Sequence, residues 1–260
     1  MTCVHVALAK NTNTAMESNM SLKFSIFDKF PELVYGFTEK NDGSMKIFDA
    51  EKQVEDQSHK ENKKRYFEKI KANFKDLIQA NLVAGNRVVV VSKKDKGKFI
   101  ENTDALITCG QGIFLGITVA DCFPIYFYNP VNKKIGLAHA GWRGIAKNIA
   151  AKIIEKLEPD KNKLKNILVG IGPGIRKCHY DIKPEVEAEF EEYKEFISNE
   201  SEKVFIDLPQ IIKYQLQTQG ILKGNIEDCQ ECTFCKDKKY FSWRRERNKM
   251  KQAMAFIGIK

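Results

Sequence analysis

The chain has 260 residues and a net charge of +9, from 43 basic and 34 acidic side chains. Hydrophobic residues make up 43% of it and charged residues 30%, which is typical of a globular protein and excludes a low-complexity chain. No apolar run approaches the roughly 20 residues that a bilayer crossing needs, so we expect no membrane partner. The lysines are spread along the chain without forming a focused basic face, which argues against nucleic-acid binding.

The beginning of the chain differs from the rest. Residues 1–21 are polar and lack a basic start followed by an apolar core, so they do not resemble a signal peptide. We expect a poorly ordered extension over 1–21 and a single domain over 22–260.

The seven cysteines are odd in number, which favours free thiols or thiolate ligands in a reducing cytoplasm over a disulfide framework. No long apolar stripe is evident, so we expect a monomer.

The pattern of apolar residues predicts interleaved strands and helices. Alternating or β-branched runs predict strands within residues 23–27, 32–39, 86–92, 103–110, 112–122, 124–141, 166–174 and 253–259. Helical spacing predicts helices over 61–74, 144–158, 184–197 and 207–220, the last with Asp207 as cap and Gly220 as stop. Because several strands are joined by short turns, the fold class is α/β (α+β), with mixed β-sheets flanked by helices and not a doubly wound parallel sheet.

Two reactive side chains meet at one end of a predicted hairpin. A turn centred near Val131 pairs residues whose numbers sum to about 262, which places Cys122 opposite Ala140 and beside His139. A cysteine and a histidine together suit zinc or a thiolate–imidazolium pair; the alternative is a buried thiol beside a core histidine. A slip of one residue changes which side chains share a face, so the register stays open.

The segment HAGWRG, residues 139–144, continues this hairpin into a predicted helix. Arg143 and Gly144 stand where the helix begins, and free N–H groups beside an arginine favour an anion such as phosphate. Trp142 offers a ring that can pack against a base. The alternative is a helix-starting turn with an exposed arginine.

Five segments, in this order, resemble the YfiH family: TDALIT, TVADCFPI, LAHAGWRGI, GIGPGIRKCHYDI and CTFCKDKKYFSWRRE. That family, formerly labelled multicopper polyphenol oxidase or laccase, includes bacterial purine nucleoside phosphorylases and the mammalian laccase-domain protein FAMIN. The similarity runs from about Val34 to Ile259, and the motifs ADC and HAGWRG are its most specific part. The resemblance implies one α/β domain, a layered sandwich like that of the cysteine–histidine toxins of the deamidating type.

The resemblance implies purine nucleoside phosphorolysis, with a purine nucleoside and phosphate as partners. Adenosine, inosine, guanosine or methylthioadenosine would react with phosphate to give the base and the ribose 1-phosphate, and adenosine deamination is implied as well. By position it implies catalytic roles for Cys122, His139 and Asp121. It implies binding of substrate and phosphate by Trp142, Arg143, Ser242, Arg244 and Lys40, although Lys40 stands where the family often has arginine.

The resemblance further implies a zinc site made of one cysteine and two histidines. The cysteine corresponds to Cys122 and the later histidine to His139. The earlier histidine belongs to a Gln-Val-His-Gly segment that reads Leu-Val-Ala-Gly here, so Ala84 occupies the place of the third ligand. We expect zinc to be weakened or lost and activity to be impaired. Either a natural member has abandoned the metal or histidine was replaced by engineering, and a clean alanine in an intact motif favours the second.

A second cysteine motif stands at Cys229, Cys232 and Cys235. Three thiolates at this spacing suggest a metal, but no fourth ligand is evident, and the resembled family has CT here without a structural zinc. We therefore expect no second metal site. His179, in KCHY, replaces what is often a second cysteine in the family and is expected near the pocket.

Two other functions stay open. In a Cys–His amidohydrolase acting on peptidoglycan precursors, Cys122 is the nucleophile and His139 the base, so activity needs no metal and thiol alkylation abolishes it. If Ala84 is native, the chain is alternatively an inactive nucleoside-binding relic. Copper is not expected, because laccase chemistry needs several copper ions and many histidines, and the chain has four histidines.

Overall fold

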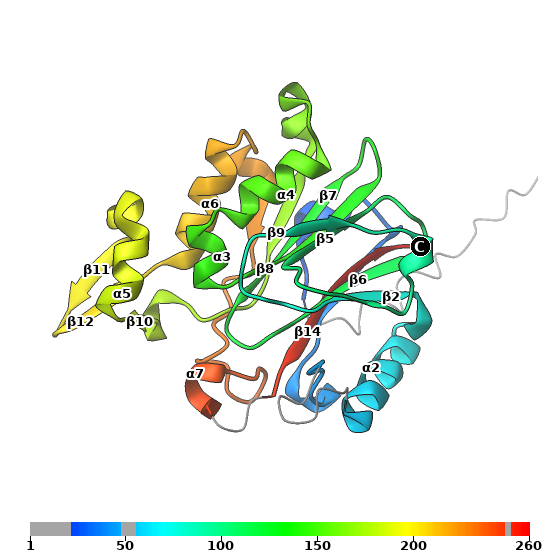
Figure 1. The fold of residues 1–260 in the computed structure, drawn as a ribbon, viewed down its shortest axis with the longest axis horizontal. Helices are drawn as coiled ribbons and strands as arrows, with labels where there is room; N and C mark the ends of the chain where they lie inside the picture. The colour runs from blue at the N-terminus through cyan, green and yellow to red at the C-terminus, as the bar shows by residue number, and fades with distance from the viewer. Residues whose placement is uncertain (1–21, 48–55, 248–250) are drawn as a thin grey trace, which may run out of the picture.

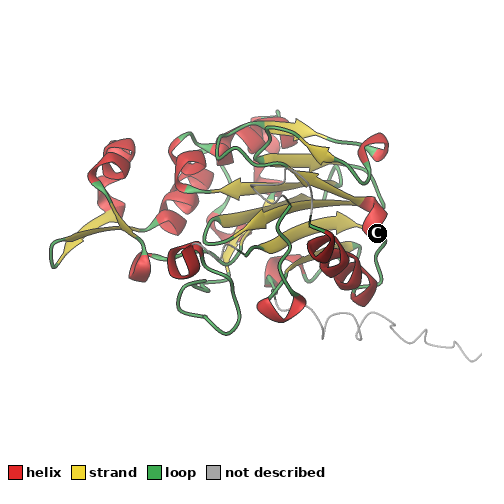
Figure 2. Cartoon of the chain, turned by 60° about the horizontal axis from the view of Figure 1, so that its bottom comes forward, coloured by secondary structure: helices red, strands yellow, loops and turns green. Residues whose placement is uncertain are grey.

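A computed structural model describes residues 22–47, 56–247 and 251–260, so the expected extension over 1–21 lies outside the described residues. Two large β-sheets pack face to face, and helices cover their outer faces (Figures 1 and 2). The six-stranded sheet has the order β13 (Ile226–Asp228), β9 (Leu168–Ile171), β7 (Phe123–Asn129), β8 (Lys134–Ala140), β5 (Ala105–Thr108) and β3 (Val88–Val90). The five-stranded sheet has the order β1 (Leu33–Phe37), β14 (Ala253–Ile259), β6 (Ile113–Val119), β2 (Leu77–Ala80) and β4 (Phe99–Ile100).

The remaining elements surround this sandwich. A small sheet, with the order β10 (Asp181–Ile182), β12 (Lys203–Ile206) and β11 (Ile197–Glu200), projects from the left side of Figure 1. The α-helices are α2 (Gln57–Lys69), α3 (Trp142–Ala146), α4 (Ile149–Leu157), α5 (Pro184–Glu187), α6 (Leu208–Thr218) and α7 (Trp243–Glu246). The short 3₁₀ helices are η1 (Ser25–Phe27), η2 (Lys40–Asp42), η3 (Phe74–Asp76), η4 (Lys93–Asp95), η5 (Lys161–Asn166), η6 (Lys177–His179), η7 (Ala188–Phe196) and η8 (Lys223–Asn225).

The alternation of side chains along the central strands creates the layers. On β7, Ile125 and Phe127 pack in the core under α4 and α6, whereas Tyr126 and Tyr128 point into the core between the two sheets. On β14, Phe256 packs outward in the cluster that contains the buried α2 side chains, while its neighbours face the inter-sheet core. The order of layers is therefore helices, six-stranded sheet, five-stranded sheet, helix, which confirms the predicted mixed sheets flanked by helices.

Three local predictions were wrong in instructive ways. The segment 23–27 was predicted as a strand but contains η1, because the i, i+3 spacing of Phe24 and Phe27 buries both rings in a 3₁₀ turn. The helix predicted over 144–158 is interrupted at Asn148, which has a φ of 52° and caps α4 through a hydrogen bond to the Ala151 N–H. The helix predicted over 184–197 is α5 followed by the kinked 3₁₀ helix η7.

Other predictions were confirmed. The Asp207 side chain accepts a hydrogen bond from the Gln210 N–H and caps α6, and Gly220 has a φ of 104° just after that helix ends.

The predicted hairpin β7–β8 forms, but its register is one residue away from the predicted one: Phe123 pairs with Ala140 and Pro124 with His139. Cys122 therefore stands immediately before β7 instead of opposite Ala140.

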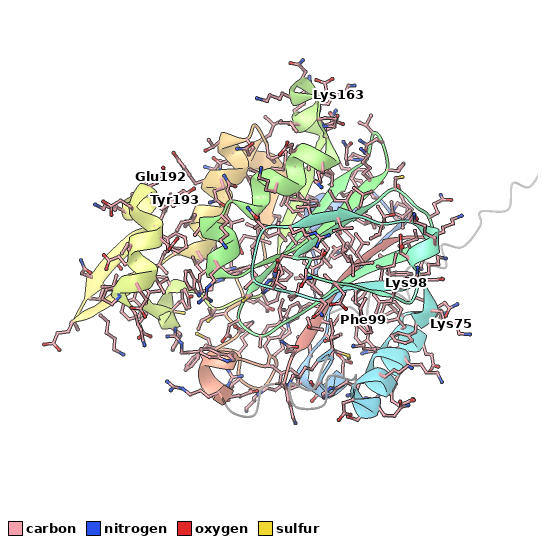
Figure 3. All side chains as sticks on the ribbon, viewed as in Figure 1. Lys75, Lys98, Phe99, Lys163, Glu192 and Tyr193 are labelled. Carbon is pink, nitrogen blue, oxygen red and sulfur yellow. The ribbon has the colours of Figure 1, made fainter. Side chains whose placement is uncertain are left out.

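In Figure 3, Lys163 lies at the top of the view and Lys75 and Lys98 lie at its right, so these three lysines are not gathered at one place. Within the described ranges, the structure contains no helix with the length and apolarity that a bilayer crossing requires.

Candidate functional site

A cavity of about 450 Å³ opens where β8 runs into α3. Segments around β10 and α7 complete its wall, and Figure 1 shows α3 left of the centre of the view with β10 and α7 below it. Six of the residues that the sequence singled out line it, together with Ala84 at the place of the missing ligand; the six are Asp121, Cys122, His139, Trp142, Arg143 and Arg244. The loop before β7, the end of β8 and the start of α7 therefore converge on one pocket.

The Cys122–His139 pair stands at the floor of this cavity. The register places His139 near the end of β8, and the Cys122 thiol and the His139 ring both lie next to Gly141. Gly141 leaves room for the pair: a Cβ on this residue would lie 3.0 Å from Cys122 Sγ and 3.4 Å from His139 Cε1. The absence of a side chain at position 141 is thus what allows the thiol and the imidazole to approach each other.

A residue that the sequence analysis missed, Asp104, orients this pair. It directly precedes β5, and its carboxylate is fully buried. One oxygen lies 3.3 Å from His139 Nδ1, and the other accepts a hydrogen bond of 2.8 Å from the Gly85 N–H. The backbone N–H of His139 also donates to the Asp104 carbonyl at 2.8 Å. Cys122, His139 and Asp104 therefore form a connected chain of groups, with the loop that carries Ala84 attached to its far end.

The electrostatics of this chain favour a charged imidazole. Burial by itself lowers the pKa of His139, but the neighbouring Cys122 thiol and Asp104 carboxylate outweigh it and raise that pKa to about 9. Burial by itself raises the pKa of Asp104, yet its hydrogen bonds with His139 and Gly85 hold it below the ordinary value. The pair therefore favours an ionised Asp104 beside a protonated His139.

Asp121, which the sequence placed among the catalytic candidates, is held by hydrogen bonds within the protein. Its carboxylate accepts from the Thr233 hydroxyl at 2.6 Å, the Ser242 hydroxyl at 3.0 Å and the Arg244 N–H at 2.7 Å. Its φ of 83° is in the left-handed region, where a residue other than glycine is strained. Ser242 also caps α7 through the Arg245 N–H, so Asp121 and Ser242 together fix the start of α7 against the pocket.

The rim of the cavity combines aromatic rings with cations. Trp142, Tyr180 and Trp243 line it, and Trp243 is 53% exposed. The Arg143 guanidinium lies 4.1 Å from the centre of the Trp142 ring, and in the part of the chain that the structure describes no carboxylate pairs with it. Helix α3, which follows Gly141, has only five residues, so an anion at this rim depends on the arginine side chain more than on the helix dipole.

The other two predicted phosphate contacts are already engaged. The Arg244 guanidinium donates to Asp181 Oδ1 at 2.6 Å and to the His179 and Asp181 carbonyls, and it lies 5.2 Å from the Tyr180 ring. Lys40 is not among the residues that line the cavity; its ammonium pairs with Glu246 at 2.8 Å. Of the predicted anion contacts, Arg143 is the one that the geometry leaves available on this cavity.

The donors in the cavity do not fit the zinc site that the resemblance implies. A catalytic zinc takes three protein ligands and keeps one position open for water or substrate. Cys122 and His139 are two such donors, but Ala84 contributes only a methyl group. Among the described residues, no third cysteine, histidine or carboxylate joins this pair in a group compact enough to share one ion. The chemistry of this chain is therefore argued below from its side chains alone.

One group of described residues does have the composition of a metal site, and it includes neither Cys122 nor His139. Cys178, His179, Cys232 and Cys235 place their ligand atoms within 4.8 Å of one another. Two of its members, Cys178 and His179, come from η6, which the sequence analysis did not connect with this cysteine motif. The motif therefore does have partners that could complete a set of four ligands. Cys229 is not part of the group.

Comparisons with known proteins agree with the fold. A protein from Geobacillus stearothermophilus, YlmD, has a solved structure that superposes with a TM-score of 0.82 at 27% identity, covering 91% of this chain and 94% of that one. The hypothetical protein YfiH from Bacillus licheniformis superposes with a TM-score of 0.81 at 29% identity, covering 88% and 93%. The molecule is thus an α/β sandwich of the YfiH and YlmD type.

Sequence comparison assigns the family. The family model described as multi-copper polyphenol oxidoreductase laccase matches residues 35–260, and the chain belongs to that family, which confirms the resemblance seen in its motifs. A relative from Bacillus subtilis, named purine nucleoside phosphorylase YlmD, is 27% identical over 88% of this chain and 89% of its own length. A relative from Staphylococcus saprophyticus, named purine nucleoside phosphorylase SSP1584, is 34% identical over 66% of this chain and 69% of its own.

Proposed function

We propose that the chain is a purine nucleoside phosphorylase that converts a purine nucleoside and phosphate into the free base and ribose 1-phosphate. The observation that carries the proposal is the cavity itself, whose lining combines the Cys122–His139 pair, three aromatic rings and an arginine that no carboxylate of the described residues pairs with. A cavity of about 450 Å³ is in the range that small-molecule ligands occupy. The relatives named purine nucleoside phosphorylase support the same substrate class.

Different side chains of the cavity are suited to bind the base and the phosphate. An aromatic face of Trp142, Tyr180 or Trp243 is suited to stack on the purine. Arg143 is suited to hold phosphate against C1′ of the ribose, so that a phosphate oxygen bonds to C1′ as the bond from C1′ to the base nitrogen breaks. The departing base takes up a proton, and His139 is the proton donor within the cavity. Asp121 and Ser242 act as positioning residues because they fix α7.

The alanine at position 84 impairs this activity in our proposal. Ala84 has a φ of 54°, a left-handed conformation that histidine adopts more readily than most residues with a side chain, so a histidine there needs no change of backbone. A ligand at this position would complete three donors for zinc, which would supply an activated water and polarise a substrate oxygen. We expect adenosine deamination, which needs such a water, to suffer more from Ala84 than phosphorolysis does.

The test is a paired assay of this chain and its Ala84→His variant. Adenine release from adenosine is followed with and without phosphate, and zinc per chain is quantified in both proteins. We expect phosphate-dependent release in both, with the variant faster and holding one more zinc ion. Val83→His, on the exposed neighbour in the same loop, is the matched control and should gain neither. Inert proteins that still bind adenosine would overturn the proposal in favour of a nucleoside-binding relic.

The connected chain Cys122–His139–Asp104 supports a second candidate, a Cys–His amidohydrolase acting on amide bonds of peptidoglycan precursors. A thiol next to a histidine that is oriented by a carboxylate is the arrangement of a cysteine nucleophile with its base. This function needs neither phosphate nor a metal. Amide cleavage that iodoacetamide abolishes and that phosphate does not affect would favour it over phosphorolysis.

A further inference from the structure

A second group of potential ligands, formed by Cys178, His179, Cys232 and Cys235, joins two distant parts of the chain. Cys178 and His179 are in η6, and Cys232 and Cys235 belong to the loop that leads to α7. Cys178 and Cys232 are 54 positions apart in sequence, yet their sulfurs lie 3.7 Å apart. Donors from η6 and from this loop therefore converge on one place.

The spacing of the donors matches a tetrahedron around one ion. A tetrahedral zinc with its usual bond lengths sets sulfur–sulfur separations of about 3.8 Å and sulfur–nitrogen separations of about 3.5 Å. The Cys178 sulfur lies 3.7 Å from that of Cys232 and 3.6 Å from that of Cys235. His179 Nδ1 lies 3.2 Å from the Cys178 sulfur and 3.3 Å from the Cys235 sulfur. Four of the six separations between the donor atoms are thus within about 0.3 Å of the tetrahedral values, and all six are within 4.8 Å.

The loop that carries two of the ligands is fixed to the segment that leads to η6. Cys232 and Cys235 have the C-x-x-C spacing common to structural zinc sites. Cys232 is buried, and its backbone forms an isolated parallel bridge with Gly174. The Thr233 N–H also donates to the Gly174 carbonyl at 3.1 Å, so the backbone beside the ligand is held in place.

The histidine is held in place by contacts of its own. Its ring stacks on Phe234 at 4.2 Å between centres with an angle of 20°, and its carbonyl accepts from Arg244. This orientation directs Nδ1 toward Cys178 and Cys235. The ligand set is therefore positioned by the surrounding protein, as a selective metal site requires.

We propose that Cys178, His179, Cys232 and Cys235 bind one zinc ion as a structural site that braces the wall of the cavity. Three cysteines and one histidine are soft and borderline donors that select zinc, and four protein ligands leave no open position for catalysis. The site would fasten η6 to the loop before α7. Tyr180 and Asp181 follow His179 directly and line the cavity, and Thr233, between two ligands, donates to Asp121. Losing the ion would therefore loosen Asp121 and the wall opposite α3.

The site is accessible enough for the ion to be removed and restored. Cys178 and Cys235 are exposed, and a separate cavity of about 330 Å³ reaches Cys178, His179 and Phe234. A chelator is therefore expected to remove the zinc from the folded protein, with a lower unfolding temperature and partial loss of the cavity's function as the result. Added zinc should reverse both changes.

The experiment uses the full chain, purified under reducing conditions, with zinc as the probe. Zinc per chain is measured for the parent and for Cys178→Ser, Cys235→Ser, Cys122→Ser and Cys109→Ser. We expect one zinc in the parent, in the Cys122→Ser variant and in the exposed control Cys109→Ser, and a loss of most of it in the other two. Cobalt substituted into the parent should show the absorption of tetrahedral thiolate coordination, a readout that needs no variant.

Three results would overturn the proposal. Zinc that is retained without Cys178 and lost without Cys122 would place the ion in the cavity instead. A reduced parent that takes up neither zinc nor cobalt would mean that the cluster is not a metal site. A disulfide between Cys178 and Cys232 or Cys235 that persists in place of zinc uptake would make the cluster a redox pair. None of these results depends on nucleoside turnover, so they are separable from the proposed phosphorylase activity.

Discussion

Asp104 and His139 are in contact through both their side chains and their backbones, at the edge of the cavity where β5 pairs with β8. Their side chains approach to 3.3 Å, and the His139 N–H donates to the Asp104 carbonyl at 2.8 Å. The pairing of β5 with β8 places Asp104 opposite His139, so the contact follows from the sheet register. A carboxylate in this position fixes the ring orientation of a functional histidine.

Replacing Asp104 with asparagine should lower activity through His139. The asparagine oxygen can still accept from Gly85, but the negative charge beside the imidazole is lost. We expect phosphate-dependent adenine release to fall by on the order of tenfold or more. The decisive readout is the pKa of His139 followed by NMR in metal-free protein, which should fall below its parent value of about 9. Asp237→Asn, in an exposed loop, is the control; an unchanged His139 titration in Asp104→Asn would reduce Asp104 to a purely structural role.

Gly141 is predicted to be needed for the geometry of the pair and not for the fold. The backbone of Gly141 has a φ of −76°, which any residue can adopt. A Cβ added at this position would, however, lie only 3.0 Å from the Cys122 sulfur. Gly141→Ala should therefore displace the thiol or the imidazole and reduce activity, while the unfolding temperature stays near that of the parent. Gly224→Ala is the matched control, because a Cβ at that position meets nothing within 4 Å. Full activity in Gly141→Ala would show that a close contact between the Cys122 thiol and the His139 imidazole is not required for activity.

Arg143 is predicted to set the affinity for phosphate. A hydrogen bond to a charged group contributes about 1.5–3 kcal/mol, so Arg143→Ala should raise the KM for phosphate roughly 10- to 100-fold. The affinity for adenosine should change less, because the arginine faces the rim and the rings remain. Steady-state kinetics with each substrate varied separately measures the difference. Lys163→Ala, at a lysine that does not line the cavity and lies at the top of the view in Figure 3, tests for a general effect of charge and should leave both constants unchanged.

The features that could be predicted from the sequence are those set by residues that are close together in the chain. The Cys122–His139 encounter was predictable because a short hairpin connects the two residues, and the observed register differs by one position. The motif HAGWRG identified Arg143 and Trp142, which line the cavity as expected. The amphipathic helices were found from their spacing, although the interruption at Asn148 depends on a side-chain cap that periodicity does not reveal.

Contacts between distant segments were not predictable in the same way. Asp104 is recognisable only once β5 is known to be the neighbour of β8, and the sequence does not state that order. The group of Cys178, His179, Cys232 and Cys235 needs η6 to meet a loop 54 positions later. A C-x-x-C pair and an adjacent Cys-His pair are each visible in the sequence, and treating them together would have been the signal for this site.

Asp228 leads to a prediction about stability and pH. Its side chain, 3% exposed, ends β13 and forms ion pairs with Arg176 and with Lys213 of α6, the latter at 2.8 Å. Burial by itself raises the pKa of Asp228, but hydrogen bonds from Arg176 and Lys213 hold it below the ordinary value. Because the folded state binds this proton less readily than the unfolded state, the contribution is present above about pH 4 and is lost as the pH falls through the lowered pKa.

The Asp228→Asn variant separates this contribution from the rest of the acid sensitivity. At pH 7 we expect it to lose about 3 kcal/mol of unfolding free energy, because it leaves the partly buried Arg176 without its counter-ion. Urea unfolding of parent and variant at a series of pH values should show the two curves approaching each other below about pH 4, where Asp228 of the parent becomes protonated. A gap that stays constant into acid would mean that packing, and not the ion pairs, makes Asp228 important. Asp237→Asn should follow the parent at every pH, since that carboxylate is exposed.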